Sequence, residues 1–341
     1  MRPDSSRYSR QMILPGFGAE GQERLRQGRV AVVGCGALGT VSAALLVRAG
    51  VGYVRLIDRD FVELSNLQRQ ALYTEADVES GMPKAAIAAE RLRAANSEVT
   101  IQGIVADLTA SNAEELLGGV DVLVDAIDNF EARFLINDVA TKTGTPWVYG
   151  AVISTYGLTM NILPGEGPCL RCLLPNPPVP GSVDTCATAG VFGPVVECIS
   201  ALQVAETVKL LLGRKDELRA GLAQFDVWDG DLRVVTVPRV PDCPACVRHD
   251  YEYLRAVATA GTVSLCGREA LQITVPRTQP LDLGDLATRL EASRPVRRTP
   301  FMLRFEAEGH ELNVFADGRA IVKGTADETV GRMLYAKYVG I

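Results

Sequence analysis

A glycine-rich turn between two apolar segments constrains the fold of this 341-residue chain more than any other feature. Residues 29–33 read RVAVV, which predicts a buried strand of a parallel sheet. Gly34-x-Gly36-x-x-Gly39 follows at once, and residues 40–49 then predict a helix that packs against that sheet. This order of strand, turn and helix is typical of an open α/β fold.

The same turn predicts a nucleotide site. Glycines let a phosphate group approach backbone N–H groups at the N-terminus of a helix. Asp58, which closes the next predicted strand at 53–57, suits the hydroxyl pair of a ribose. On these residues alone the nucleotide can be NAD, FAD or ATP, and a tightly packed turn without a ligand is the alternative.

Strands and helices alternate through the first half of the chain, which predicts a doubly wound, Rossmann-like α/β sheet. The other strands expected in this sheet are at 99–105, 120–126 and 147–151, and the helices expected between strands are at 84–95 and 130–143. Strand-like segments at 156–163, 223–228 and 232–237 predict that antiparallel strands extend this parallel half, beside a helix at 195–212.

The chain is expected to have a large domain and a small one. Residues 1–248 form the large domain, residues 249–260 a linker, and residues 261–341 a small α+β C-terminal module. The module is predicted to contain strands at 263–266, 301–306, 312–315 and 320–322 and helices at 283–292 and 328–338.

Polar side chains gather where the predicted parallel strands end. They are Asn66, Gln68 and Arg69 in the loop after Asp58, Lys84 at the start of the next helix, and Asp128 and Asn129 after the strand at 120–126. These positions converge on one crevice of a doubly wound sheet. Arg and Lys neutralise phosphate oxygens, and an acid can hold Mg²⁺. The set suits the triphosphate of ATP better than a dinucleotide, although each residue taken alone can be a solvated loop residue.

Two Cys-x-x-Cys motifs predict a metal centre. Cys169 and Cys172 form the first, and Cys243 and Cys246 the second. Four thiolates can surround Zn²⁺ in a closed tetrahedral site, which is structural and not catalytic. Buried free thiols or a redox pair are the alternatives.

The other cysteines are less informative. Cys186 lies in a loop rich in Gly, Pro, Ser and Thr, where it is either a nucleophile with a stabilised thiolate or an inert thiol. Cys35, Cys198 and Cys266 are expected to be structural.

Composition removes several classes of function. A net charge of −6 without a long basic run argues against a nucleic-acid partner. Uncharged stretches stop short of the ~20 apolar residues that span a bilayer, and the polar N-terminus lacks the apolar region of a secretory signal. We therefore expect a cytoplasmic protein. Only His249 and His310 are present, so no histidine base is expected in the first half of the chain.

Taken together and in this order, the motifs resemble those of the ThiF/MoeB/HesA family, bacterial relatives of the ubiquitin-activating enzymes. The resemblance covers residues 7–248. It rests on RYSRQMILPGFGAEGQERL, VGCGALG, LIDRDFVELSNLQRQ, GMPKA, DAIDNFEAR, CLRC, DTCATAGVFGP and CPAC. It implies an ATP-dependent adenylyltransferase that activates the C-terminal glycine carboxylate of a ubiquitin-like sulfur-carrier protein (MoaD/ThiS-like) as an acyl-AMP, before a thiocarboxylate forms.

The resemblance also implies roles for single residues. Asp58 would bind the ribose, and the Gly34–Gly39 loop and Ser65–Arg69 would wrap the nucleotide. Arg69 and Lys84 would contact the phosphates, and Asp128 would hold Mg²⁺. Arg10 would reach the triphosphate from the partner subunit of a homodimer. Cys186 matches a loop cysteine that some members use in sulfur transfer and others dispense with. Ala37 departs from the glycine of many members, with little consequence because the contact there is through the backbone.

A peptide carboxylate, with a pKa of about 3.5, is already ionised at neutral pH and needs no general base. We expect it to attack the α-phosphorus of ATP while cationic side chains offset the charge on pyrophosphate. Sulfur from a persulfide donor, a cysteine desulfurase or a rhodanese, would then displace AMP. The pathway stays open among molybdopterin, thiamine, tRNA thiolation and cysteine synthesis.

Residues 261–341 do not resemble the rhodanese domain that some relatives append, and we expect them to dock the carrier or support a dimer. Three other functions are possible for such a chain. An NAD-dependent dehydrogenase leaves the loop SNLQRQ and the cysteine motifs unexplained. A related adenylating enzyme could act on another acceptor, as a tRNA-modifying dehydratase or in peptide modification. A non-catalytic scaffold does not need the phosphate-handling residues.

Overall fold

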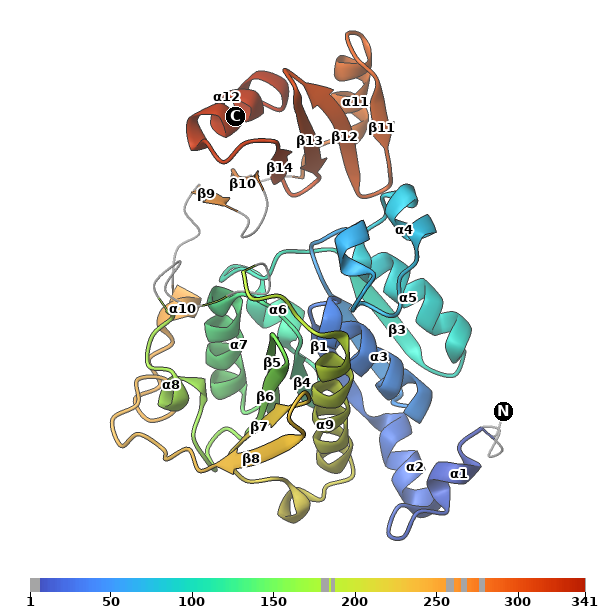
Figure 1. The fold of residues 1–341 in the computed structure, drawn as a ribbon, viewed down its shortest axis with the longest axis vertical. Coiled ribbons are helices and arrows are strands. Elements are labelled where there is room, and N and C mark those ends of the chain that lie inside the picture. The colour runs from blue at the N-terminus through green and yellow to red at the C-terminus, as the bar shows by residue number, and fades with distance from the viewer. Residues whose placement is uncertain are drawn as a thin grey trace. The chain divides into compact units, whose positions relative to one another are not determined.

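The chain divides into two units, Met1–Ala256 and Val257–Ile341. The structure, a computed structural model, describes residues 7–178, 184, 188–255, 261–264, 269–275 and 280–340 (Figure 1). None of the described helices is both long and apolar enough to cross a membrane.

The first unit is built on one eight-stranded sheet with the order β3-β2-β1-β4-β5-β6-β7-β8. Its parallel strands are β1 (Arg29–Val33), β2 (Tyr53–Ile57), β3 (Thr100–Ile104), β4 (Val122–Asp125) and β5 (Trp147–Ile153). The antiparallel strands are β6 (Tyr156–Ile162), β7 (Leu222–Asp226) and β8 (Asp231–Val235). The predicted doubly wound sheet with an antiparallel extension is confirmed.

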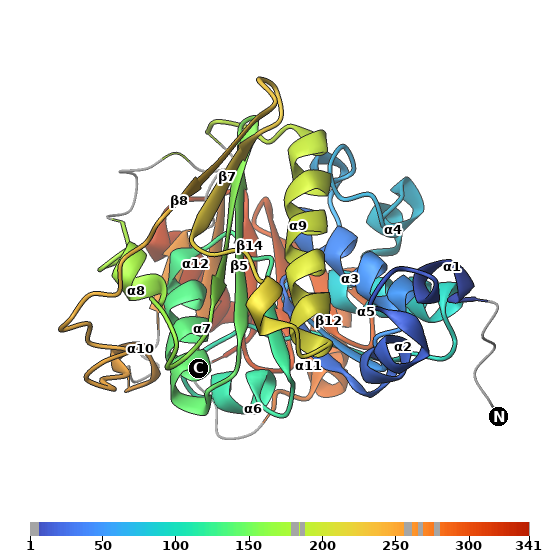
Figure 2. The same ribbon diagram turned by 90° about the horizontal axis from the view of Figure 1, so that it is seen from below.

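Helices cover both faces of the parallel half, because its strands are apolar on both sides. In β1, Val30 and Val32 belong to one buried cluster, whereas Ala31 and Val33 belong to the other. Helices α3 (Ala37–Ala49), α5 (Lys84–Ala95) and α9 (Gly193–Leu211) pack on the first face. Helices α6 (Ala113–Leu117) and α7 (Phe130–Thr143) pack on the second, and Figure 2 shows the two layers.

The strand order reverses at β1. The chain runs outward from β1 to β2 and β3, and then returns to β4 on the other side of β1. In the registers, Val33 pairs with Ile57 and with Asp125, so the segments after these three strands lie at one edge of the sheet. Ligands of open α/β folds bind at such a reversal, outside the carboxyl ends of the strands.

Short elements complete the first unit. They are α1 (Ser9–Met12), α2 (Gly18–Gln27), the 3₁₀ helix η1 (Leu64–Asn66), α4 (Glu75–Ser80), α8 (Leu170–Leu173), the 3₁₀ helix η2 (Lys215–Glu217) and α10 (Glu252–Arg255). Helix α10 lies inside the segment 249–260 that was expected to be a linker. Its Tyr253 packs on Phe134 of α7, with ring centroids 4.8 Å apart.

The second unit is α+β, as predicted for the C-terminal segment. Its antiparallel sheet has the order β11-β12-β13-β14-β10-β9. The strands are β9 (Gly261–Ser264), β10 (Ala270–Thr274), β11 (Val296–Arg298), β12 (Met302–Ala307), β13 (His310–Phe315) and β14 (Ala320–Lys323). Helices α11 (Leu283–Glu291) and α12 (Glu328–Tyr338) join the same buried cluster as the sheet.

Candidate nucleotide site and metal centre

The turn between β1 and α3 has a shape that requires glycine at two positions. Gly34 has φ of +95°, and a Cβ there would lie 2.5 Å from the carbonyl oxygen of Ala126. A Cβ on Gly39 would lie 1.8 Å from the carbonyl oxygen of Gly34. These two glycines therefore let the turn pack against the segment that follows β4.

Gly36 differs from its neighbours, because packing does not exclude a side chain there. The nearest atom to a Cβ on Gly36 would be Nε2 of Gln70, at 3.7 Å. Gly36 is also the N-cap of α3, and none of the side chains that the structure describes caps this helix. The first N–H groups of α3 thus have no side-chain partner and can bind an anion.

Asp58 lies against this turn. One of its carboxylate oxygens accepts the Cys35 N–H at 2.6 Å, and the other accepts the Asp60 N–H at 2.6 Å. Burial raises the pKa of Asp58 above its usual value, and the charge of Lys84 opposes that rise. The acid predicted to bind a ribose is therefore fixed beside the glycines.

Lys84 begins α5 next to the same segment. Its side chain is buried, its Nζ lies 3.7 Å from a carboxylate oxygen of Asp60, and its N–H donates to the Asp60 carbonyl at 2.8 Å. Asp60 was not among the predicted site residues. Asp60 holds Lys84 near Asp58. The ion pair of Lys84 with Asp60 could not be predicted from the sequence, because 24 positions separate the two residues.

The loop after β2 contributes residues of two kinds. Asn66 is buried, and its Oδ1 accepts the Glu63 N–H at 3.2 Å, so this side chain shapes η1. Ser65 and Gln68 are exposed. Arg69 is half-buried and donates from Nη1 to the Ser65 carbonyl at 2.9 Å.

The segment after β4 carries Asp128 and Asn129. Asp128 is exposed, whereas Asn129 caps α7 by accepting the Ala132 N–H at 2.9 Å. The side-chain oxygen of Asn129 is therefore already engaged. The exposed carboxylate at the reversal point is that of Asp128, and it interacts electrostatically with Arg59 and Arg133.

An ion pair that the sequence analysis missed fixes this segment. Arg133 donates to Asp125 at 3.2 Å, to the Ile127 carbonyl at 2.7 Å and to the Gly150 carbonyl at 2.9 Å. Burial raises the pKa of Asp125 to about 6, against the opposing charge of Arg133, so the pair is charged at neutral pH. It links the end of β4 to Gly150 in the middle of β5.

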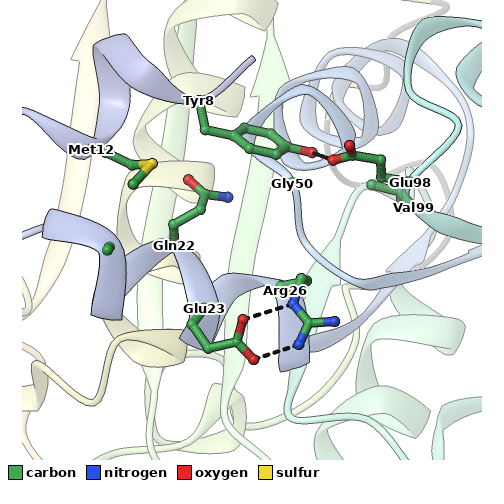
Figure 3. Close-up of a pocket in the computed structure, with 9 residues that line it drawn as sticks. Tyr8, Met12, Gln22, Glu23, Arg26, Gly50, Glu98 and Val99 are labelled. Atoms are coloured by element: carbon green, nitrogen blue, oxygen red, sulfur yellow. Dashed lines mark hydrogen bonds and ion pairs between the residues drawn. The ribbon is translucent and has the colours of Figure 1, made fainter. Parts of the chain in front are cut away.

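Arg10 lies far from this set within one chain. It is exposed on α1, two residues after Tyr8, which is buried. The Tyr8 hydroxyl donates to Glu98 at 2.9 Å and accepts from Asn96 at 2.9 Å. Figure 3 shows Tyr8 and Glu98 beside Gly50, in a cavity of about 170 Å³.

Gly50 ends α3, whereas the glycine turn begins it. Because α3 has 13 residues, its two ends are about 20 Å apart. Helix α1 is therefore at the opposite end of α3 from the glycine turn of its own chain.

The four cysteines of the two Cys-x-x-Cys motifs come together. Their sulfur atoms all lie within 4.8 Å of one another, and the pairs Cys169–Cys243 and Cys172–Cys246 are each 3.6 Å apart. All four are free thiols. In a tetrahedral site with Zn–S bonds of 2.3 Å, sulfur atoms are about 3.8 Å apart, so the donor set fits zinc.

The remaining cysteines divide by position. Cys186 and Cys266 lie outside the described residues. Cys35 is buried in the glycine turn, and Cys198 is partly buried on α9.

Comparison with known proteins agrees with this geometry. The ThiF family matches residues 8–245. A Bacillus subtilis (strain 168) protein named sulfur carrier protein ThiS adenylyltransferase is 42% identical over 339 residues, covering 98% of this chain and 100% of that protein. A Thermus thermophilus protein named sulfur carrier protein adenylyltransferase is 46% identical over 250 residues, covering 72% of this chain and 92% of that protein.

A solved structure shares the fold. The crystal structure of E. coli MccB with ATP has a TM-score of 0.63 and 22% identity, over 71% of this chain and 75% of that one. Together with the family match over most of the first unit, the sequence identity and the site geometry lead to one assignment. This chain belongs to the ThiF family.

Proposed function

We propose that this chain is an adenylyltransferase that uses ATP to activate the C-terminal glycine carboxylate of a ubiquitin-like sulfur-carrier protein as an acyl-AMP. One observation carries the proposal: the glycine turn, Asp58, Lys84 and Asp128 lie at one edge of the sheet, at the reversal of strand order. The names of the Bacillus and Thermus relatives support a sulfur carrier as the acceptor.

The chemistry needs charge neutralisation more than proton transfer. The carrier carboxylate is ionised at neutral pH, and the obstacle is its approach to a highly negative triphosphate. Lys84 and Arg69 would stabilise the charge that develops on pyrophosphate when the α-phosphorus is attacked. Asp58 would orient the ribose, and the N–H groups at the start of α3 would bind a phosphate.

Arg10 would complete the site from the partner subunit of a homodimer. It cannot serve its own chain, because Tyr8 anchors α1 about 20 Å from the glycine turn. In a symmetric dimer, the same arginine of each copy reaches the site of the other.

Two metal ions are part of the proposal. The exposed carboxylate of Asp128 would hold Mg²⁺, which neutralises phosphate charge when bound. Cys169, Cys172, Cys243 and Cys246 would hold a structural Zn²⁺. Clustered cysteines that can hold a metal ion suit a reducing compartment, and we also place the protein in the cytoplasm.

The later steps are proposed on chemical grounds. The terminal sulfur of a persulfide donor would attack the acyl-AMP and displace AMP, which leaves an acyl disulfide between the carrier and the donor. A second thiol would then cleave this disulfide by exchange and release the thiocarboxylate. Cys186 stays either a thiol that takes part in this transfer or an inert one. The second unit would dock the carrier or support the dimer, and it is included in the match to the Bacillus relative, which covers 339 residues.

Carrier-dependent exchange of labelled pyrophosphate into ATP tests the function. We expect exchange with a carrier that ends in Gly-Gly, and none with the same carrier lacking its last glycine. Exchange that ignores the carrier, or its absence with every Gly-Gly carrier tried, would contradict the proposal.

Two glycine variants test the position of the phosphates. We expect Gly36→Ala to fold with a loss below about 1 kcal/mol but to bind ATP at least tenfold more weakly, because its Cβ fills space left for a phosphate. Gly39→Ala should lose on the order of 3 kcal/mol of folding stability, because its Cβ meets the Gly34 carbonyl oxygen. Calorimetric ATP titration and denaturant unfolding measure the two effects. Normal ATP affinity in Gly36→Ala would place the phosphates elsewhere.

A further inference from the structure

Three segments of the proposed ATP site meet at one buried hydroxyl. The single hydroxyl proton of Tyr73 is shared between two carbonyl oxygens, that of Cys35 at 2.8 Å and that of Lys84 at 3.2 Å. The backbone N–H of Tyr73 donates to the Gln70 carbonyl at 3.1 Å, which ties Tyr73 to the loop that carries Arg69. Its side chain is 5% exposed. The hydroxyl thus joins the glycine turn, the start of α5 and the loop after β2.

The bond to Cys35 acts on a peptide that needs an external restraint. Cys35 lies between Gly34 and Gly36, and glycine backbones rotate more freely than those of other residues. In a planar trans peptide, the C=O of Cys35 and the N–H of Gly36 point in opposite directions. A hydroxyl that fixes the carbonyl on one side therefore fixes the direction of the Gly36 N–H on the other.

The bond to Lys84 completes a closed set of contacts. The Lys84 N–H is bound to the Asp60 carbonyl, and the Asp60 N–H and the Cys35 N–H are both bound to Asp58. The Tyr73 hydroxyl, bound to the carbonyls of Cys35 and Lys84, closes this series of hydrogen bonds into a ring of five residues. Two routes therefore fix the distance between the glycine turn and Lys84: one runs through Asp58 and Asp60, and the other runs through Tyr73.

Burial raises the pKa of Tyr73 well above its ordinary value. The hydroxyl therefore stays protonated and remains a donor at neutral pH.

We infer that Tyr73 is a positioning residue for ATP: its hydroxyl sets the direction of the Gly36 N–H and the place of Lys84 relative to the glycine turn. The inference rests on the ATP site proposed above. Tyr73 lies behind the backbone and touches no reactant, so its effect is on nucleotide affinity and not on carrier binding.

Tyr73→Phe tests this, because phenylalanine keeps the buried ring and removes only the hydroxyl. We expect the Kd for ATP, measured by calorimetry without a carrier, to rise about tenfold, which corresponds to about 1.4 kcal/mol. The KM for ATP in pyrophosphate exchange should rise with it, while the KM for the carrier stays within twofold of wild type.

Tyr335→Phe is the matched control. Tyr335 is also a buried tyrosine whose hydroxyl donates to a carbonyl, that of Gly318 at 2.6 Å, and it belongs to the second unit. We expect it to lose a similar amount of thermal stability and to bind ATP normally. If Tyr73→Phe is poorly stable, the rise in Tm on adding ATP gives a second measurement, and it should be smaller than in wild type.

An ATP affinity of Tyr73→Phe within twofold of wild type would overturn the inference, even with a lowered Tm. So would an equal rise of the two KM values. A wild-type chain that binds ATP but activates no carrier would overturn the proposed function and leave this inference standing. A wild-type chain that binds no ATP would overturn both.

Discussion

Alanine in place of Arg10 or Asp128 should abolish carrier-dependent pyrophosphate exchange in each homodimer, whereas a dimer with one variant in each subunit should regain about half of the wild-type activity. Each variant removes a group proposed to balance the triphosphate charge, and such losses lower rates at least ~100-fold. Both side chains are exposed, so neither substitution should unfold the chain.

The mixed dimer should regain activity because α1 lies far from the glycine turn of its own chain. A site takes Asp128 from one chain and Arg10 from the other, so the mixed dimer has one site with both groups and one with neither. Co-expression with two affinity tags, followed by purification on both, isolates the mixed dimer. Arg48→Ala, at another exposed arginine, is the control and should be fully active. An inactive mixed dimer would mean that Arg10 does not act in the partner, and an active Arg10→Ala homodimer would remove its role altogether.

Removal of the metal from the cysteine cluster should lower Tm on the order of 10 °C, a loss of ~4 kcal/mol. The cluster joins helix α8 to the segment that carries Cys243 and Cys246, and the facing cysteines are 74 positions apart, so a bound ion restrains a long stretch of chain. It also supports the neighbouring α7, whose Asn137 accepts the Leu170 N–H at 2.8 Å and whose Asp138 accepts the Tyr253 N–H at 2.9 Å.

Metal content by mass spectrometry and Tm by calorimetry check this result before and after chelation. Cys243→Ser should lose the metal and reproduce the lowered Tm. Cys198→Ser, which changes a partly buried cysteine outside the cluster, should keep both. An unchanged Tm after verified removal of the metal would contradict a structural role.

Much of the first unit could be predicted because its signals are local. The parallel strands are apolar on both faces, and the glycine turn between β1 and α3 is visible as a short motif. The contact with Ala126 that requires Gly34 could not be read from that motif, because only the fold creates it. The cysteine cluster was predicted from two short motifs, although only the fold brings their sulfur atoms within bonding distance of one ion.

The second unit was harder to predict. Strand β10 was missed because it is a short segment whose strand character comes from pairing with β9 and β14. Strand β11 is three residues long, two of them arginine, and is defined by its pairing with β12. Helix α10 is one turn long and is stabilised by contacts with α7. Non-local partners decide all three.

The candidate site also combines features that the sequence predicts with features that depend on non-local contacts. A sequence places polar residues at strand ends but does not say whether a side chain faces a ligand or its own backbone. Asn66 and Asn129 both bind backbone N–H groups, whereas Asp128 is exposed. The role of Tyr73 could not be predicted, because its hydroxyl binds backbone carbonyls. The ion pair of Asp125 with Arg133 could not be predicted either, because its members are eight positions apart and meet only in the fold.

The intact mass of the carrier protein after incubation with this chain and ATP is the most direct test of the central claim. If an ionised carboxylate attacks the α-phosphorus, the carrier gains one adenylyl group and pyrophosphate is released. A carrier that gains a phosphoryl group with release of ADP, or that keeps its mass while ATP is consumed, would contradict the claim.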